Sequence, residues 1–127
     1  MTLLGEAKNC YVDGYFMATV MLATAFIEHT LSNRLQNKGL TTKSRPFAES
    51  IRLAREHSLY ESILLDRTDH LREIRNPFAH RRPPEDVHTL GNRYLAEKKH
   101  PDVVLDADAQ ESLKVMYEFL AQAQTQD

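Results

Sequence analysis

The chain has 127 residues, enough for one domain with a single hydrophobic core. Hydrophobic residues make up 42% of the chain, and four Gly and five Pro are too few for a turn-rich all-β fold. The formal net charge of -2 excludes a global basic field that would attract nucleic acid or a membrane, so any anion site must be a local patch.

The chain shows no sign of disulfides, export or membrane insertion. Cys10 is the single cysteine, which excludes an internal disulfide and a cysteine-based zinc site. The start, MTLLGEAKN, lacks the basic-then-apolar layout of a signal peptide. The longest strongly apolar stretch, residues 15–27, is shorter than the roughly 20 residues that span a bilayer. We therefore expect one cytoplasmic domain over residues 1–127.

The first third of the sequence predicts two helices. A short helix is expected over residues 3–12, interrupted by Asp13-Gly14. A second helix, rich in Ala, Leu and Met, is expected from Tyr15 to Lys38-Gly39, where the glycine is a helix C-terminal signal. Because its first half is apolar nearly all round, we expect this helix at the centre of a bundle.

Two more helices are predicted in the middle of the chain. Ser44 is expected to cap the third, with Pro46 in its first turn and an end near residue 57. The fourth begins near residue 59, and its apolar positions keep their helical phase across Pro77, which predicts a kinked or restarted helix. This buried seam consists of Leu64, Leu71, Ile74 and Phe78.

The last third of the sequence is harder to interpret. The Pro-Pro pair at 83–84 ends the preceding helix, residues 87–99 suit a partial helix, and the His-Pro pair at 100–101 marks a turn. Asp106 or Asp108 is expected to cap the last helix, since Asp108 and Glu111 match a capping box. Its apolar stripe is Leu113, Met116, Tyr117 and Leu120. The whole pattern predicts an all-α bundle of four to five helices.

The stretch LREIRNPFAHRR, residues 71–82, brings an Arg, an amide and an imidazole together. On a continuous helix Arg72, Asn76 and His80 share one face, because they are four residues apart. Arg75 lies between this row and the buried seam, and its side chain can reach towards His80. Alternatively, Asn76 caps a new short helix with Pro77 at its first position.

The residue types in this stretch suit phosphate chemistry. Arginine presents a planar, permanently charged fork that matches phosphate oxygens, and histidine exchanges a proton near neutral pH. Four arginines face the single Glu73 in this stretch, and we expect Arg72, Arg81 and Arg82 to hold substrate phosphates. The spacing of these residues alone is also typical of an ordinary solvated helix end that carries a surface histidine.

The segment RNPFAH resembles the Arg-Asn-x-x-x-His motif of HEPN domains, small all-α proteins named for higher eukaryotes and prokaryotes nucleotide-binding. An Ala-rich helix containing TAFIEHTL precedes the helix that closes in LREIRN, and a C-terminal helix follows, as in that family. The resemblance covers roughly residues 6–123. It implies a HEPN-like bundle, and HEPN proteins include metal-independent endoribonucleases, many of them toxins or defence effectors, as well as non-catalytic modules.

Carried onto this sequence, the resemblance implies that Arg75 and His80 are the catalytic pair and that Asn76 supports them. It also implies that Glu28 points towards the motif helix and orients Arg75, whereas without the resemblance Glu28 reads as a surface carboxylate paired with a nearby base. HEPN toxins paired with minimal nucleotidyltransferase antitoxins tend to carry Tyr two residues after the His. Arg82 occupies that position here, which argues against that class of antitoxin.

The resulting hypothesis is a metal-independent endoribonuclease that works as a homodimer without a cofactor. One His80 per chain cannot act as base and acid in a single step, so two chains must share a composite site. The expected partners are RNA, a second copy of the chain, and an antitoxin or neighbouring regulatory protein. The alternative is a non-catalytic HEPN-like helical module that binds a protein or a nucleotide.

Overall fold

The structure is a computed structural model that describes residues 2–79 and 101–125, and every regular element within these ranges is a helix. The all-α fold class is therefore confirmed. None of these helices is long and apolar enough to cross a membrane. The helix expected over residues 87–99 lies outside the described residues. The described helices are α1 (Leu3–Val12), α2 (Phe16–Asn37), α3 (Phe47–Glu56), α4 (Ser62–Ala79) and α6 (Pro101–Thr125).

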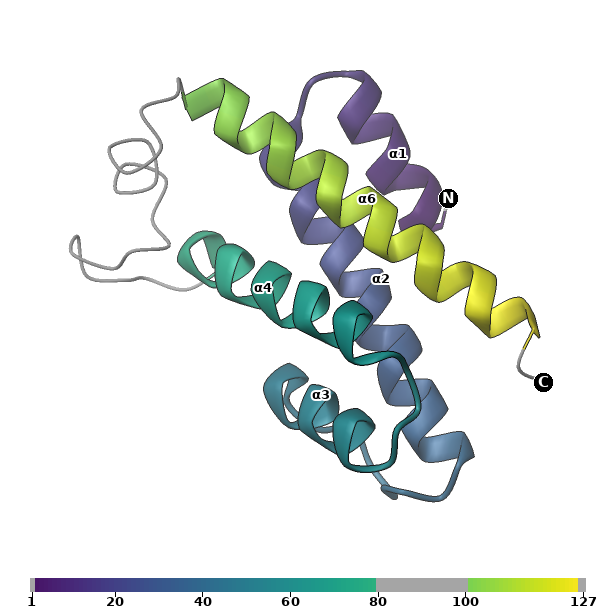
Figure 1. Cartoon of the computed structure of the whole chain (residues 1–127). Helices are drawn as coiled ribbons and strands as arrows, with labels where there is room; N and C mark the ends of the chain where they lie inside the picture. Colours follow the sequence, from purple (N-terminus) through teal and green to yellow (C-terminus); the bar gives the residue numbers. More distant parts are fainter. Residues whose placement is uncertain (1, 80–100, 126–127) are drawn as a thin grey trace.

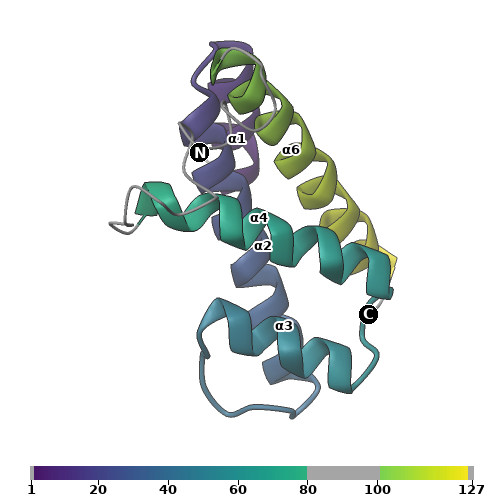
Figure 2. The same ribbon diagram turned by 60° about the vertical axis from the view of Figure 1, so that its left-hand side comes forward.

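Helix α2 is the centre of the bundle, as its apolar pattern predicts. It contacts α1, α3, α4 and α6 (Figure 1). In the turned view α4 crosses α2, with α3 on one side of α4 and α6 on the other (Figure 2). Hydrophobic residues of α2 that are 0% exposed recur at helical spacing: Val20, Ala23, Ile27, Leu31 and Leu35.

The hydrophobic core has a large and a small part. The large part joins all five helices, and Leu64 and Leu71 of the predicted α4 seam belong to it. The small part consists of Val20, Ile74 and Ala109, with Tyr11 and Phe16 packed against them. Ile74 is 2% exposed, so the small core anchors the end of α4 that carries the motif arginine. The side chain of Phe78, also expected in the seam, lies outside the described part.

The ends of the first two helices follow from local signals. The Thr2 hydroxyl accepts a hydrogen bond of 3.1 Å from the backbone N–H of Gly5, which caps α1. The chain then turns through Gly14, whose φ of +82° is unstrained only for glycine. Helix α2 ends before Gly39, which has a φ of +73°. These boundaries agree with the prediction within one residue.

In the middle of the chain the expected cap of the third helix is wrong, whereas the continuous helix across Pro77, one of the two alternatives, is found. Helix α3 begins at Phe47 with Pro46 at its N-cap and no side-chain cap, because the Ser44 hydroxyl instead accepts a hydrogen bond of 3.4 Å from Ser32. Helix α4 begins at Ser62 and continues through Pro77 to Ala79 without a new start. A second helix capped by Asn76 is therefore excluded.

The expected start of the last helix is also wrong. Helix α6 begins at Pro101, so Asp106 and Asp108 lie inside it and do not cap its start. Asp106 instead accepts a hydrogen bond of 2.9 Å from the Tyr11 hydroxyl, and Asp108 is buried with 6% exposure. Acidic residues that look like local caps are used here in tertiary contacts.

The buried face of α6 differs from the predicted stripe in part. Met116 is 0% exposed, as expected, but Tyr117 is 41% exposed. Val115 and Phe119, which the stripe omits, are fully buried in the large core. Helix α6 therefore buries a face that is rotated by about one residue from the predicted apolar stripe.

Candidate functional site

Arg75 is the residue of the motif whose surroundings the structure defines best. It follows Ile74, which is buried in the small core, and this places Arg75 on the edge of α4 that faces α2. Its Nη1 lies 3.7 Å from Oε1 of Glu28 on α2, with side-chain exposures of 16% and 38%. Glu28 therefore lies beside the motif helix, and its role in orienting Arg75 stays a prediction.

Phe47, the first residue of α3, also lies beside Arg75. The guanidinium carbon of Arg75 lies 5.2 Å from the centroid of the Phe47 ring, within the range of a cation–π contact. Phe47 is 4% exposed. Arg75 of α4 therefore links three helices, because its guanidinium contacts Glu28 of α2 and the Phe47 ring of α3.

Phe47 is the member of this site that sequence reasoning missed. It carries no motif and is remote from Arg75 in the chain. Its one sequence signal is an aromatic residue at the start of an amphipathic helix, which indicates a buried anchor rather than a partner for a particular arginine.

Arg72 makes ion pairs within its own helix. Its Nε donates a hydrogen bond of 2.9 Å to Oδ1 of Asp69, and its guanidinium also pairs with Glu73. Its side chain is 19% exposed. Two carboxylates therefore offset the positive charge of Arg72, which we expected to hold a substrate phosphate. Asp69 lies just before the stretch of residues 71–82, so the count of charges in that stretch does not include it.

The remaining motif residues are described only in part or not at all. The backbone of Asn76 belongs to α4, and its side chain lies outside the described part. His80, Arg81 and Arg82 lie outside the described residues altogether. The structure thus brings together Arg75 and Glu28, and the geometry between Arg75 and His80 stays a prediction.

A cavity of about 460 Å³ adjoins Glu28. Its wall includes Glu28 and His29 of α2 and Arg45 of the loop before α3. Arg45 is held by a hydrogen bond of 3.2 Å from its Nε to the Thr41 hydroxyl and by an ion pair of 3.7 Å with Glu49. Polar groups of both signs therefore lie beside the carboxylate that pairs with Arg75.

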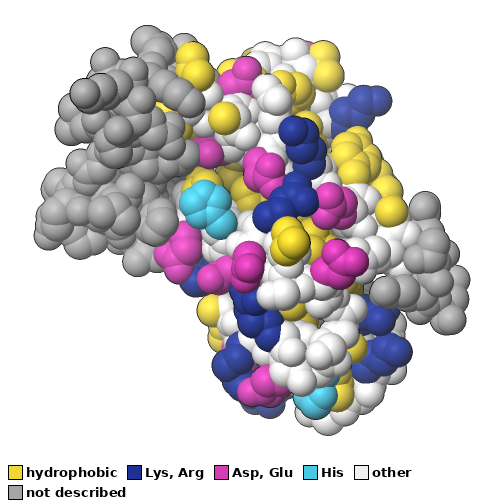
Figure 3. All heavy atoms as spheres, in the orientation of Figure 1, with side chains coloured by type: hydrophobic (Ala, Val, Ile, Leu, Met, Phe, Trp, Pro, Cys, Tyr) yellow, Lys and Arg dark blue, Asp and Glu magenta, His cyan; other side chains and the backbone are white. Residues whose placement is uncertain are grey.

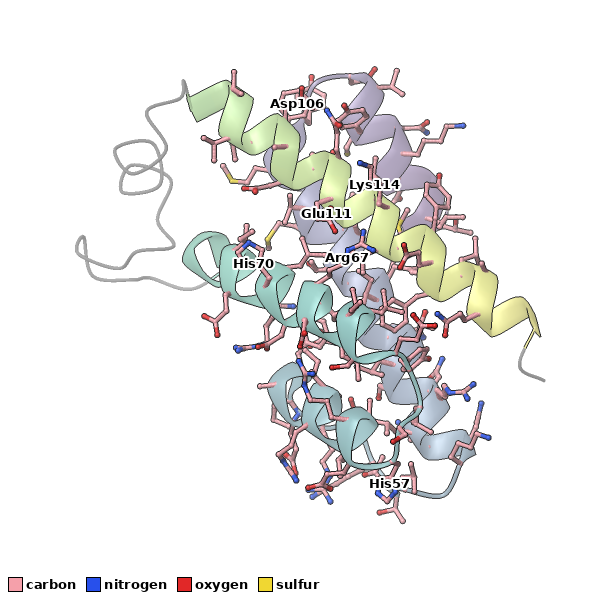
Figure 4. The ribbon with its side chains drawn as sticks, in the orientation of Figure 1. His57, Arg67, His70, Asp106, Glu111 and Lys114 are labelled. Carbon is pink, nitrogen blue, oxygen red and sulfur yellow. The ribbon has the colours of Figure 1, made fainter. Side chains whose placement is uncertain are left out.

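A separate group of paired charges lies between α4 and α6. Arg67 of α4 and Glu111 of α6 point toward each other (Figure 4), and a hydrogen bond of 2.5 Å from Arg67 Nε to Glu111 raises the pKa of Arg67. A second hydrogen bond of 2.9 Å joins Arg67 Nη1 to Glu118. In Figure 3 basic and acidic side chains alternate over this face. These contacts tie two helices together and create no patch of one sign.

No three His, Cys, Asp or Glu side chains among residues 2–79 and 101–125 come close enough to hold a metal ion. Comparison with protein-family models, curated proteins and solved structures found no match for this chain.

Proposed function

We propose that this chain is a HEPN-type endoribonuclease that cleaves RNA without a metal ion in a site shared by two copies. The observation that carries the proposal is the contact of Glu28 with Arg75. The resemblance implies this contact between two distant parts of the sequence, and it joins the Ala-rich helix to the motif helix. The all-α architecture of the described residues agrees with the same resemblance.

The surroundings of Arg75 suit a group that meets a phosphate at a fixed position. Glu28 attracts the guanidinium from one side and Phe47 supports its plane, so fewer orientations of the side chain remain to be lost on binding. The proposed role of Arg75 is to stabilise negative charge on the non-bridging phosphate oxygens as the transition state forms. Glu28 acts through Arg75 and is a positioning residue.

The proposed reaction is an internal transesterification. His80 of one copy accepts the proton of a ribose 2'-hydroxyl while the bond from that oxygen to phosphorus forms. The bond from phosphorus to the 5'-oxygen breaks, and the partner's His80 donates a proton to that oxygen. The products are a 2',3'-cyclic phosphate and a free 5'-hydroxyl, and Arg75 of each copy is proposed to lie beside the phosphate.

A second candidate function is a non-catalytic binding module. It is favoured by the burial of Arg75, which is 16% exposed and already engaged with Glu28 and Phe47. An arginine used in this way also serves as a structural link between helices. The pairing of Arg72 with Asp69 and Glu73 points in the same direction.

RNA cleavage by the purified chain in the presence of a chelator distinguishes the two functions. The wild type and His57→Ala should cleave, whereas His80→Ala should be slower by about 100- to 10,000-fold. His57 is an exposed histidine at the end of α3 and serves as the matched control. If the wild type and His80→Ala cleave RNA equally fast, or if neither cleaves RNA, the catalytic role is excluded and the non-catalytic binding module remains.

A further inference from the structure

A second cavity, of about 520 Å³, lies where α2 ends. Five of its residues recur at helical spacing along one face of α2, and Tyr60 of the loop between α3 and α4 and Ala123 of α6 complete it. These five are Thr30, Asn33, Arg34 and Asn37 of α2 and Lys38 at its C-cap. The volume falls within the range of small-molecule sites. Every α2 side chain in the wall carries a hydrogen-bonding group, and none is acidic.

Arg34 differs from the other arginines that the structure describes. Each of the others forms an ion pair with a carboxylate: Arg45, Arg52, Arg55, Arg67, Arg72 and Arg75. The guanidinium of Arg34 instead lies over the ring of Tyr60, at 5.4 Å from its centroid. Its Nε is buried and has no hydrogen-bond partner among the described residues. The cation is thus placed by stacking, and its charge is not matched by a described carboxylate.

The electrostatic balance of this cavity favours an anion. Arg34 and Lys38 contribute two positive charges, and Lys38 pairs with no carboxylate in the described part of the chain. The C-terminal ends of α2 and α6 oppose them with roughly half a negative elementary charge each. Burial raises the pKa of Tyr60, although the charge of Arg34 lowers it in part, so the phenol stays neutral near pH 7. Among the described residues the balance is positive, and dark blue side chains gather in Figure 3 where α2 ends.

We infer that this cavity binds a sugar phosphate, either a free molecule or the 5'-phosphorylated end of an RNA. Arg34 and Lys38 provide the charge-assisted donors that a phosphate group requires. The carboxamides of Asn33 and Asn37 both donate and accept, which suits sugar hydroxyls. Arg75 lies about 20 Å along α4 from the start of that helix, which follows Tyr60. Arg75, Glu28 and Phe47 do not line this cavity, so the inference does not depend on the proposed nuclease activity.

Titration of the full chain with ribose 5-phosphate, followed by amide NMR, tests the inference. Saturable shifts should concentrate on residues 30–38, Tyr60 and Ala123. Lys38→Glu should weaken binding about tenfold or more, the scale of a lost charge-assisted hydrogen bond. Lys8→Glu makes the same charge change at an exposed site on α1 and should change affinity less than about twofold.

Two further variants locate the phosphate and the sugar. Arg34→Gln should also weaken binding, with circular dichroism checking that the helices remain. Asn33→Ala should weaken ribose 5-phosphate and leave inorganic phosphate unchanged, because only the sugar uses the amide. The inference is overturned by a Kd above about 10 mM for ribose 5-phosphate, or by equal losses in Lys38→Glu and Lys8→Glu.

The source of the phosphate is tested with a short RNA bearing either a 5'-phosphate or a 5'-hydroxyl. If the same residues shift with the phosphorylated RNA alone, and ribose 5-phosphate also binds, the site takes RNA ends. If ribose 5-phosphate binds and neither RNA does, the site takes a free sugar phosphate. Equal shifts with both RNAs at residues 30–38 would show that the phosphate ester is not recognised and would overturn the inference.

Discussion

The carboxylate of Glu28 on α2 lies 3.7 Å from the guanidinium of Arg75 on α4. This distance is too long for a direct hydrogen bond and short enough for electrostatic attraction between the two groups. Because the pair is partly exposed, its contribution to the free energy of unfolding should be small, up to about 1 kcal/mol. Its larger effect should be on the position of the guanidinium.

Glu28→Gln should therefore lower the rate of RNA cleavage while leaving the fold in place. The substitution keeps the size of the side chain and removes its charge, so Arg75 loses its orientation, with an expected loss of about 10- to 100-fold in kcat. The control is Glu49→Gln, since Glu49 is 34% exposed and pairs with Arg45 at a comparable 3.7 Å. A purely structural role would shift the melting temperature of both variants alike and leave both rates unchanged.

Arg75→Ala should remove cleavage and also destabilise the chain. Loss of the contact with Phe47 and of the pair with Glu28 should cost about 1–2 kcal/mol of unfolding free energy. Urea unfolding and the cleavage rate together test this. Arg52→Ala, which removes an arginine that is 56% exposed, should change neither by much. Wild-type cleavage by folded Arg75→Ala would contradict the assigned role.

The RNA products should end in a 2',3'-cyclic phosphate on one fragment and a 5'-hydroxyl on the other, because the 2'-hydroxyl is the proposed nucleophile. DNA of the same sequence should stay intact, and a single 2'-deoxy substitution should block cleavage at that position. Chemical analysis of the fragment ends provides the measurement. Cleavage that depends on added metal and leaves 5'-phosphate ends would show that the chemistry is of another kind.

The active species should be a symmetric dimer, since the proposed reaction needs one histidine as base and another as acid. Light scattering on the purified chain at tens of micromolar should give about twice the mass of one chain. His80→Ala should keep this mass, which separates assembly from chemistry. A monomer that retains full activity would refute the shared site.

Alkaline unfolding should report on Tyr60. Burial raises the pKa of Tyr60 above its ordinary value of 10.0, so the folded chain holds this proton more tightly than the unfolded chain does. The associated stability is complete below that value and is lost as the pH rises through the higher folded pKa. Tyr60→Phe should therefore make the unfolding free energy less dependent on pH above about 10. An unchanged dependence would show that Tyr60 titrates alike in both states.

Where local signals and tertiary contacts agree, the sequence predicts the fold well. Thr2 and Gly14 bound α1, and the continuous apolar surface of α2 predicts its central place. The predictions failed where a residue with a local preference is engaged by a distant partner. Ser44 pairs with Ser32 and Asp106 with Tyr11, and neither partner is visible from the local pattern.

In the candidate site, too, some contacts could be predicted from the sequence and others depend on how the helices pack. The family resemblance identifies Arg75 and predicts the approach of Glu28, because both belong to a pattern of residues along two helices. The stacking of Arg75 on Phe47 depends on how α3 packs against α4, which no periodicity encodes. The sequence analysis did not single out the face of α2 around Arg34, because the significance of that face depends on Tyr60, which comes from a separate loop.

The central position of α2 also determines how the bundle can come apart. Each of α1, α3, α4 and α6 contacts α2, so any one of them can open locally while the other three keep their common partner. Opening of α2 removes that partner from all four at once. The backbone amides around Ile27 and Leu31 should therefore exchange with solvent only through something close to global unfolding, whereas those of the outer helices can exchange through smaller fluctuations.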